Sequence, residues 1–143
     1  AHAANSMRLE KGYRAWGSDL TTERSPLEAG LARFVRNREH PRWQAVSDRA
    51  NDWEMVLIEI LSDTAHPFHA HGLWQAGRCV GMVSSAAFGH RCGKSLALAW
   101  LRDRAARSGL ELDILGRRVP ARILDRPPFD PDDLRLRHGG EPI

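Results

Sequence analysis

The sequence lacks the features that mark secreted and membrane-spanning proteins. Its 143 residues include two cysteines, Cys79 and Cys92, which lie in separate segments and form no C-x-x-C motif. Two cysteines in a chain of this length are no disulfide framework, so we expect a reducing cytoplasm. No segment approaches the roughly 18–20 consecutive apolar residues of a membrane helix, and the first residues lack the charged-then-apolar pattern of a signal peptide. We therefore expect a cytoplasmic protein that does not contact a membrane.

Lysine is scarce, and positive charge is not concentrated anywhere along the chain. Of the 21 basic residues only Lys11 and Lys94 are lysines, and the formal net charge is +3 at pH 7. The arginines occur in small scattered groups, not in the dense basic stripe of a nucleic-acid-binding protein. We therefore expect no nucleic-acid partner. A composition of 42% hydrophobic and 27% charged residues is typical of a soluble chain of about one domain.

The first fifty residues carry short helical signals. Residues 1–16 fit either a strand or a short helix. Ser25 is a helix cap, Pro26 stands at the first helical position and Glu28 completes an S-x-x-E capping box, so a short helical turn is expected there. A second short helix is expected within residues 35–52, where apolar residues recur at helical spacing.

After Asp52 the pattern changes to that of strands. Short runs rich in valine, isoleucine and leucine are separated by glycine-centred turns. The expected strands are 54–62, 72–75, 79–89, 93–101, 110–116 and 117–124. This arrangement predicts a small antiparallel barrel or sandwich. The tail beyond residue 124 is rich in proline and aspartate, and we expect it to end in disorder.

Three histidines form the most visible cluster of potential metal ligands. His66, His69 and His71 lie within six residues and could bind zinc or copper. Their spacing fits no standard zinc finger, and no cysteine or carboxylate stands at a matching distance. The segment is also bounded by proline and glycine, which favours a solvated loop. We therefore assign no metal site.

Two further motifs fall short of a catalytic or nucleotide site. Ser84 and Ser85 are followed by His90, but the G-x-S-x-G elbow and a third partner are missing, so a hydrolase is not indicated. The segment GHRCGKS at 89–95 departs from a phosphate-binding loop by one position. It also continues into a strand where that loop needs a helix. We interpret it as a glycine-permitted turn between two strands.

The segment from Arg8 to Trp16 holds the strongest candidate for ligand binding. The Arg8 guanidinium can bind carboxylates or the edge of a planar heterocycle at two points, and Glu10 can accept from ring N–H groups. Tyr13 and Trp16 can supply flat apolar walls with a polar edge. These groups suit a flat, anionic, hydrogen-bonding cofactor. A buried Arg8–Glu10 pair among core aromatic residues explains the same composition equally well.

Three blocks of the sequence resemble the aminomethyltransferase family. The first is NSMRLEKGYRAWGSDLTTE followed by SPLEAGL, the second GLWQAGRCVGMVSSAAFGHRCGKSLALAWL and the third LELDILGRRVPARILDRPPFDP. They stand in the order that the family has and cover nearly the whole chain. The segment E-K-G-Y-R-x-W-G is more similar to the folate domains fused behind dimethylglycine and sarcosine dehydrogenases than to the glycine-cleavage T-protein.

The resemblance implies a module of a tetrahydrofolate-dependent one-carbon transfer enzyme. In this family, folate lies in a central channel between domains and receives a one-carbon unit from a small N-methylated amine. Arg8 and Glu10 would line the pterin end of the channel, and Tyr13 and Trp16 would form its wall. The family's pterin-anchoring aspartate lies upstream of this chain, so we assign no catalytic residue. FAD would belong only to a longer parent chain.

The resemblance also divides the chain into two parts. Residues 1–52 would be the C-terminal remnant of the folate-binding domain, with short helices. Residues 53–143 would be the C-terminal barrel, in which Arg135 or Arg137 could meet the folate glutamate. The expected fold is α+β and mainly β: a partial α/β segment followed by a small antiparallel β-barrel of the Greek-key type.

Two functions of different classes remain open at this point. In the first, the chain is the C-terminal part of a folate-dependent enzyme and is inactive alone. Its residues 1–35 would then expose apolar side chains and promote self-association. In the second, it is a non-catalytic β-barrel module that binds a partner or ligand, and residues 1–35 would be buried. We expect the burial of this segment to separate the two.

Overall fold

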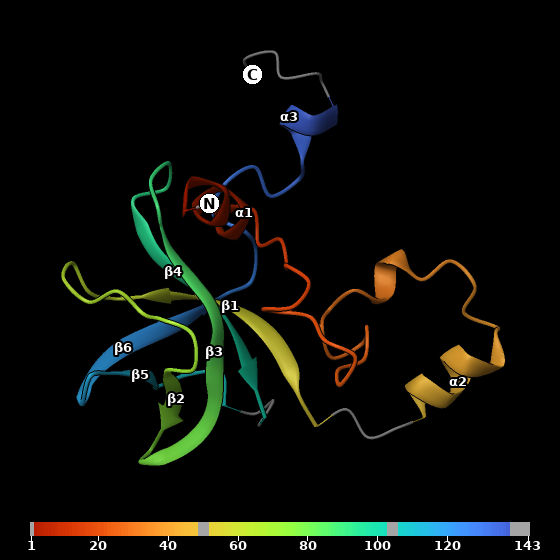
Figure 1. The fold of residues 1–143 in the computed structure, drawn as a ribbon, viewed down its shortest axis with the longest axis horizontal. Helices are drawn as coiled ribbons and strands as arrows, with labels where there is room; N and C mark the ends of the chain where they lie inside the picture. The colour runs from red at the N-terminus through yellow and green to blue at the C-terminus, as the bar shows by residue number, and fades with distance from the viewer. Residues whose placement is uncertain (1, 49–51, 103–105, 138–143) are drawn as a thin grey trace.

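Antiparallel strands close into a barrel in the computed structural model, which describes residues 2–48, 52–102 and 106–137. The strands are β1 (Glu54–Ile60), β2 (Gly72–Gln75), β3 (Arg78–Gly89), β4 (Lys94–Leu101), β5 (Leu110–Ile114) and β6 (Arg117–Leu124). Their order around the barrel is β1-β4-β3-β2-β5-β6, and β1 closes it by pairing with both β4 and β6 (Figure 1). The predicted strands and the mainly β fold are confirmed, and the sandwich alternative is wrong.

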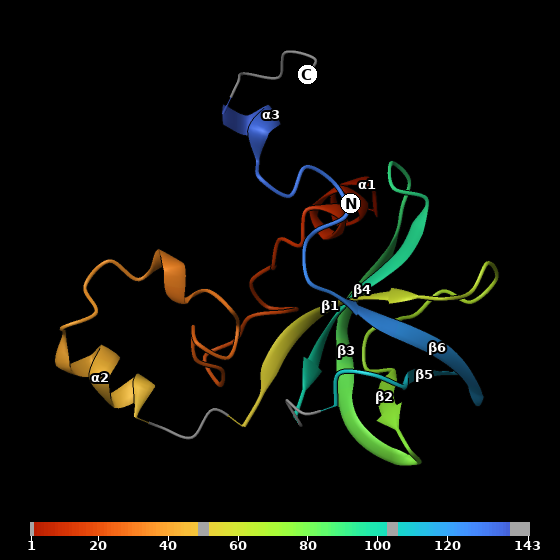
Figure 2. The same ribbon diagram turned by 180° about the vertical axis from the view of Figure 1, so that it is seen from behind.

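The helices are short and lie outside the barrel. They are α1 (His2–Glu10), the 3-10 turn η1 (Ala32–Phe34), α2 (Pro41–Ser47) and α3 (Leu134–Arg137). The first lies against β3 and β4, whereas α2 projects away from the barrel (Figure 2). Among the described residues, none of these helices has the length and hydropathy that crossing a membrane requires. The expected helix within 35–52 is confirmed as α2.

The predicted capping box and the short helical turn both form. The backbone N–H of Ser25 donates to Glu28 Oε2 at 2.8 Å, and the N–H of Glu28 donates to Ser25 Oγ at 3.2 Å. The chain then turns at Gly30, whose φ of +67° lies in the left-handed region. That conformation ends the helical path after a single turn.

The described part of the tail ends in the short helix α3. Asp130 Oδ1 accepts from the backbone N–H of Leu134 at 2.8 Å, which caps the first turn of α3. The expectation of a disordered end falls on residues 138–143, which lie outside the described residues. The sequence analysis missed this signal, in which Asp130 stands four residues before Leu134 and accepts from its backbone N–H.

Strands β1 and β4 bury side chains on both of their faces. Val56, Ile58 and Ile60 of β1 point into the barrel and join its central core. The alternate residues Met55 and Leu57 point outward and pack in a second cluster that includes the chain's N-terminal part. This second cluster consists of Leu9, Ala29, Met55, Leu57, Leu96, Leu98 and Trp100. This burial explains why the sequences of β1 and β4 are almost continuously apolar, because a strand that is covered on both faces needs no polar face.

Within the expected segment 1–35, the described residues 2–35 are neither fully buried nor fully exposed. Leu9 and Ala29 cover the outer face of the barrel and are buried. The larger side chains of the same segment are open to solvent, namely Met7, Tyr13, Trp16 and Phe34. The segment is part of the folded unit, and it also presents exposed apolar side chains, as expected for the first of the two functions.

Glu59 makes the stability of the barrel depend on pH. It lies on the outer face of β1, where it accepts from Lys94 Nζ at 2.7 Å and Arg122 Nε at 2.9 Å. Burial raises the pKa of Glu59, but the bonds from Lys94 and Arg122 outweigh burial and hold this pKa below its ordinary value. A carboxylate with a lowered pKa stabilises the fold above its unfolded pKa, about 4.3, and that contribution is lost as pH falls through the folded pKa.

We expect the free energy of unfolding to fall between about pH 5 and pH 3 and the Glu59→Gln variant to fall less steeply. Urea unfolding at several pH values measures both slopes. Other carboxylates with lowered pKa values, such as Asp130 and Asp133, keep some slope in the variant. Identical slopes for the variant and the wild type over this range would contradict the assignment.

Candidate functional site

The four predicted ligand-binding residues lie at the end of α1 and in the loop that follows it. Arg8 is mostly shielded, and the Glu10 side chain is buried at 1% exposure. Tyr13 is 41% exposed and Trp16 is 73% exposed, so the two aromatic side chains face solvent. Arg8 and Glu10 do not pair with each other, and the aromatic residues are not in the core, so the alternative interpretation of a buried pair is wrong.

A buried aspartate that the sequence analysis missed organises this loop. Asp19 Oδ2 accepts from Arg8 Nη1 at 2.6 Å and from the backbone N–H of Ala15 at 2.8 Å. Its other oxygen, Oδ1, accepts from the hydroxyls of Ser84 at 2.6 Å and Ser85 at 2.5 Å. The carboxylate therefore fixes Arg8, the loop and strand β3 to one another.

The two serines reach the same carboxylate because β3 is irregular at this point. Successive side chains of a regular strand point to opposite faces. The register of β3 against β4 shifts between Val83 and Ser85, and a bulge of this kind turns neighbouring residues to the same side. Their hydroxyls serve the aspartate network and are not paired with His90, which stacks edge-on against Phe88.

A shallow pocket of about 260 Å³ opens beside Arg8. It lies between α1, the 67–69 segment and β3, and its lining includes Asn5, Ser18, Phe68 and His69. The ring of His69 bonds the backbone oxygen of Ser84 at 2.8 Å. Across the described part of the chain, no three histidine, cysteine or acidic side chains converge on a metal position. The histidine-rich segment is a loop packed against β3.

Glu10 holds the turn between β3 and β4. Its Oε1 accepts from the backbone N–H groups of Arg91 at 2.6 Å and Cys92 at 3.1 Å. A Cβ at Gly89 would lie 2.9 Å from Glu10 Cγ and 2.6 Å from Cys92 Sγ, so only glycine allows this approach. The G-H-R-C-G-K-S segment is thus a tight turn closed by a carboxylate from α1.

Tyr13 ties the loop to the C-terminal tail. Its hydroxyl donates to Asp133 Oδ1 at 2.7 Å, and Lys11 Nζ lies 2.8 Å from the same oxygen and 3.0 Å from Asp130 Oδ2. The bonds to Asp133 and Asp130 hold the pKa of Lys11 above its ordinary value. This network brings the tail that bears Arg135 against the loop. The sequence analysis did not predict this link.

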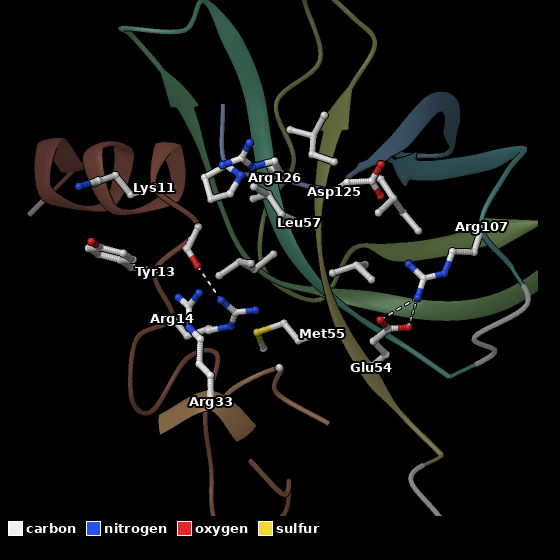
Figure 3. A pocket seen from close by; sticks show the side chains of 17 residues that line it. Lys11, Tyr13, Arg14, Arg33, Glu54, Met55, Leu57, Arg107, Asp125 and Arg126 are labelled. Atoms are coloured by element: carbon white, nitrogen blue, oxygen red, sulfur yellow. Dashed lines mark hydrogen bonds and ion pairs between the residues drawn. The ribbon is translucent and has the colours of Figure 1, made fainter. Parts of the chain in front are cut away.

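A second pocket, of about 270 Å³, is lined by Tyr13 and by the residues that follow and precede it, Arg14 and Gly12 (Figure 3). Its floor is apolar and includes Met55 and Leu57 of β1. Its rim is rich in charge, with Lys11, Arg14, Arg33, Glu54, Arg107, Asp125 and Arg126. The structure thus separates the predicted residues: Arg8 borders one pocket and Tyr13 the other, while Glu10 is buried in the 89–93 turn. Cofactor binding by the four residues stays a prediction.

The chain matches two family models. Residues 54–130 match the glycine cleavage T-protein C-terminal barrel domain, and residues 1–39 match the GCVT N-terminal domain. In three dimensions the chain is similar to the glycine cleavage system aminomethyltransferase T from Bartonella henselae. The TM-score is 0.79 at 20% identity, over 90% of this chain and 38% of that one. This likeness shows the barrel fold.

Relatives of three kinds match nearly the whole chain. Mouse mitochondrial dimethylglycine dehydrogenase is 31% identical over 98% of this chain and 17% of its own length. The 4-methylaminobutanoate oxidase (formaldehyde-forming) of Paenarthrobacter nicotinovorans is 32% identical over 95% of this chain and 17% of its own. The aminomethyltransferase of Synechococcus elongatus is 32% identical over 87% of this chain and 36% of its own.

The chain spans about one sixth to one third of the length of these relatives. Mitochondrial and bacterial proteins are both among them, so the predicted cytoplasmic location stays a prediction. The resemblance inferred from the three sequence blocks is confirmed by the family models and by the shared barrel. This chain therefore belongs to the family of the glycine cleavage T-protein C-terminal barrel domain.

Proposed function

We propose that this chain is the C-terminal part of a tetrahydrofolate-dependent one-carbon transfer enzyme that acts on a small N-methylated amine. Dimethylglycine and sarcosine dehydrogenases, 4-methylaminobutanoate oxidase and aminomethyltransferase are all similar to it over most of its length. The observation that carries the proposal is the exposure of Tyr13 and Trp16 in the loop after α1, where the shielded Arg8 guanidinium donates to the backbone carbonyl of Tyr13. Flat aromatic surfaces next to a positive charge suit a flat anionic cofactor such as folate.

The proposed role is to supply one wall of a folate channel. Trp16 and Tyr13 would stack on the ring systems of the folate, and Arg8 would donate to its polar edge. The Arg8 guanidinium is already oriented by Asp19 and by the carbonyl of Tyr13 at 3.0 Å. A group held in place before binding loses little entropy on contact, and that favours catalysis by positioning. Folate would reach the buried Glu10 side chain only if the 89–93 turn opened.

The proposed roles of the two parts of the chain follow the predicted domain boundary. Residues 1–52 would be the end of a folate-binding domain and 53–143 the barrel, in agreement with family matches that fall at 1–39 and 54–130. We propose that a preceding part of the enzyme covers the exposed Met7 and Phe34. Any FAD would be held outside this chain. Without such a cover, these apolar side chains would promote self-association.

Calorimetric titration with tetrahydrofolate up to millimolar concentration tests the proposal. We expect saturable binding, and we expect Trp16→Ala to weaken it about tenfold, or about 1.4 kcal/mol. Trp16 is a better probe than Arg8, because removing Arg8 leaves the buried Asp19 unpaired and perturbs the fold.

Leu115→Ala is the matched control, because Leu115 is 92% exposed in the turn between β5 and β6. Its binding should equal that of the wild type. Saturable binding that both variants weaken alike would contradict the proposed wall. Absence of binding by the wild-type chain would instead favour a structural module.

A further inference from the structure

Two arginine side chains lie against each other in the pocket beside Tyr13 without an acidic partner. Arg14 and Arg33, here called the arginine pair, point into the same pocket, and Figure 3 shows their guanidinium groups side by side. Within the described ranges neither of them forms an ion pair. Two like charges at close range repel each other unless a negative charge lies between or beside them.

The other arginines of this pocket are already neutralised. Arg107 Nη2 donates to both carboxylate oxygens of Glu54, at 2.7 and 2.6 Å, and Arg126 pairs with Asp132. Asp125, the other acidic residue of the lining, lies at the opposite end of the pocket from the arginine pair (Figure 3). Asp19 attracts Arg14 more weakly than Arg33 repels it, and its carboxylate forms its ion pair with Arg8.

The Arg14 guanidinium is held by one hydrogen bond, and another of its N–H donors has no partner. Its Nη1 donates to the carbonyl of Gly12 at 2.9 Å, but its Nε is buried and has no hydrogen-bond partner. A Cβ at Gly30 would lie 3.1 Å from Arg14 Nη2, so the glycine leaves room for the guanidinium. Burial lowers the pKa of Arg14 and the charge of Arg33 lowers it further, whereas the nearby Asp19 raises it by less. An unsatisfied buried donor and a nearby like charge both favour the binding of an anion at this position.

We propose that the arginine pair binds a carboxylate group of a small ligand in this pocket. Planar guanidinium groups match carboxylates at two points each, and such charge-assisted bonds are the strong ones. A volume of about 270 Å³ with an apolar floor accommodates the group that carries the carboxylate. The carboxylate can come from the glutamyl end of a folate or from a small amino acid. Only the assignment to folate depends on the proposed function.

An NMR titration of the full chain that follows the arginine Nε–H signals tests the inference. The probes are p-aminobenzoylglutamate and dimethylglycine, which carry carboxylates, and a tetrahydropterin without a carboxylate. We expect a carboxylate probe to shift the Arg14 Nε–H signal saturably and the tetrahydropterin to leave it unchanged. Arg33→Gln should weaken the carboxylate affinity about tenfold. Arg33 is exposed, so this variant should fold normally.

Arg36→Gln is the control, because it removes the same charge from an exposed residue outside the pocket lining. Its affinity should stay at the wild-type value. A response to p-aminobenzoylglutamate alone assigns the site to folate, and a response to dimethylglycine assigns it to amino acids. The inference is overturned if neither probe shifts Arg14 Nε–H, or if both variants lose affinity equally. Calorimetric binding of tetrahydrofolate without any Arg14 shift would overturn this inference and leave the proposed function intact.

Discussion

Replacing Asp19 by alanine is expected to lower the free energy of unfolding by about 3–5 kcal/mol. The substitution removes a fully buried carboxylate that accepts four hydrogen bonds, including the ion pair with Arg8. The largest part of the cost is the Arg8 cation, which keeps its shielded position but loses its counter-charge. The hydroxyl of Ser85 loses its acceptor as well, whereas that of Ser84 keeps the carbonyl of Leu98 at 3.2 Å. Urea unfolding followed by circular dichroism measures the loss.

The control for Asp19 is an aspartate whose ion pair lies in solvent. Asp132 pairs with Arg126, and both side chains are more than half exposed. Asp132→Ala should change the free energy of unfolding by less than about 1 kcal/mol. If the Asp19 and Asp132 variants were equally stable, the aspartate network would not be what joins the loop to β3.

The second large effect is expected at Glu10. Glu10→Ala removes the acceptor of the Arg91 and Cys92 backbone N–H groups, and we expect it to cost about 2–4 kcal/mol. The amide groups then lie in a turn that cannot shift freely, because β3 and β4 fix both of its ends. Thermal and urea unfolding report the global effect. Faster hydrogen exchange of the amides at 91 and 92 reports the local one.

Glu10→Gln separates the acceptor from the charge. Glutamine keeps a carbonyl oxygen that can occupy the position of Oε1, so the variant should lose less than about 1.5 kcal/mol. A loss as large as that of Glu10→Ala would mean that the negative charge, and not the acceptor geometry, holds the turn. A wild-type stability of Glu10→Ala would contradict the role of Glu10 altogether.

The barrel could be predicted from the sequence because its signals are local. Runs such as 110–116 and 117–124 alternate around a glycine turn, and the structure has β5 and β6 at these places. The family resemblance likewise depended on contiguous blocks. The short helical turn after Ser25 was predicted as well, because its capping box lies within four consecutive residues.

The contacts of the candidate site are less predictable, because they join residues distant in the sequence. Asp19 meets Ser84 and Ser85 through a strand irregularity that no spacing rule reveals. Glu10 was predicted to face a ligand on the strength of its position between Arg8 and Tyr13. Its side chain instead turns inward, because α1 lies against the end of β3 and places it below the 89–93 turn.

Hydrogen exchange of the chain with and without saturating tetrahydrofolate is the most direct test of the proposed folate wall. The account predicts slower exchange at the backbone amides of residues 11–20, between the end of α1 and the loop that bears Tyr13 and Trp16. The hairpin of β5 and β6 should exchange at the same rate in both samples. Protection confined to that hairpin, or no protection in either region, would contradict the account.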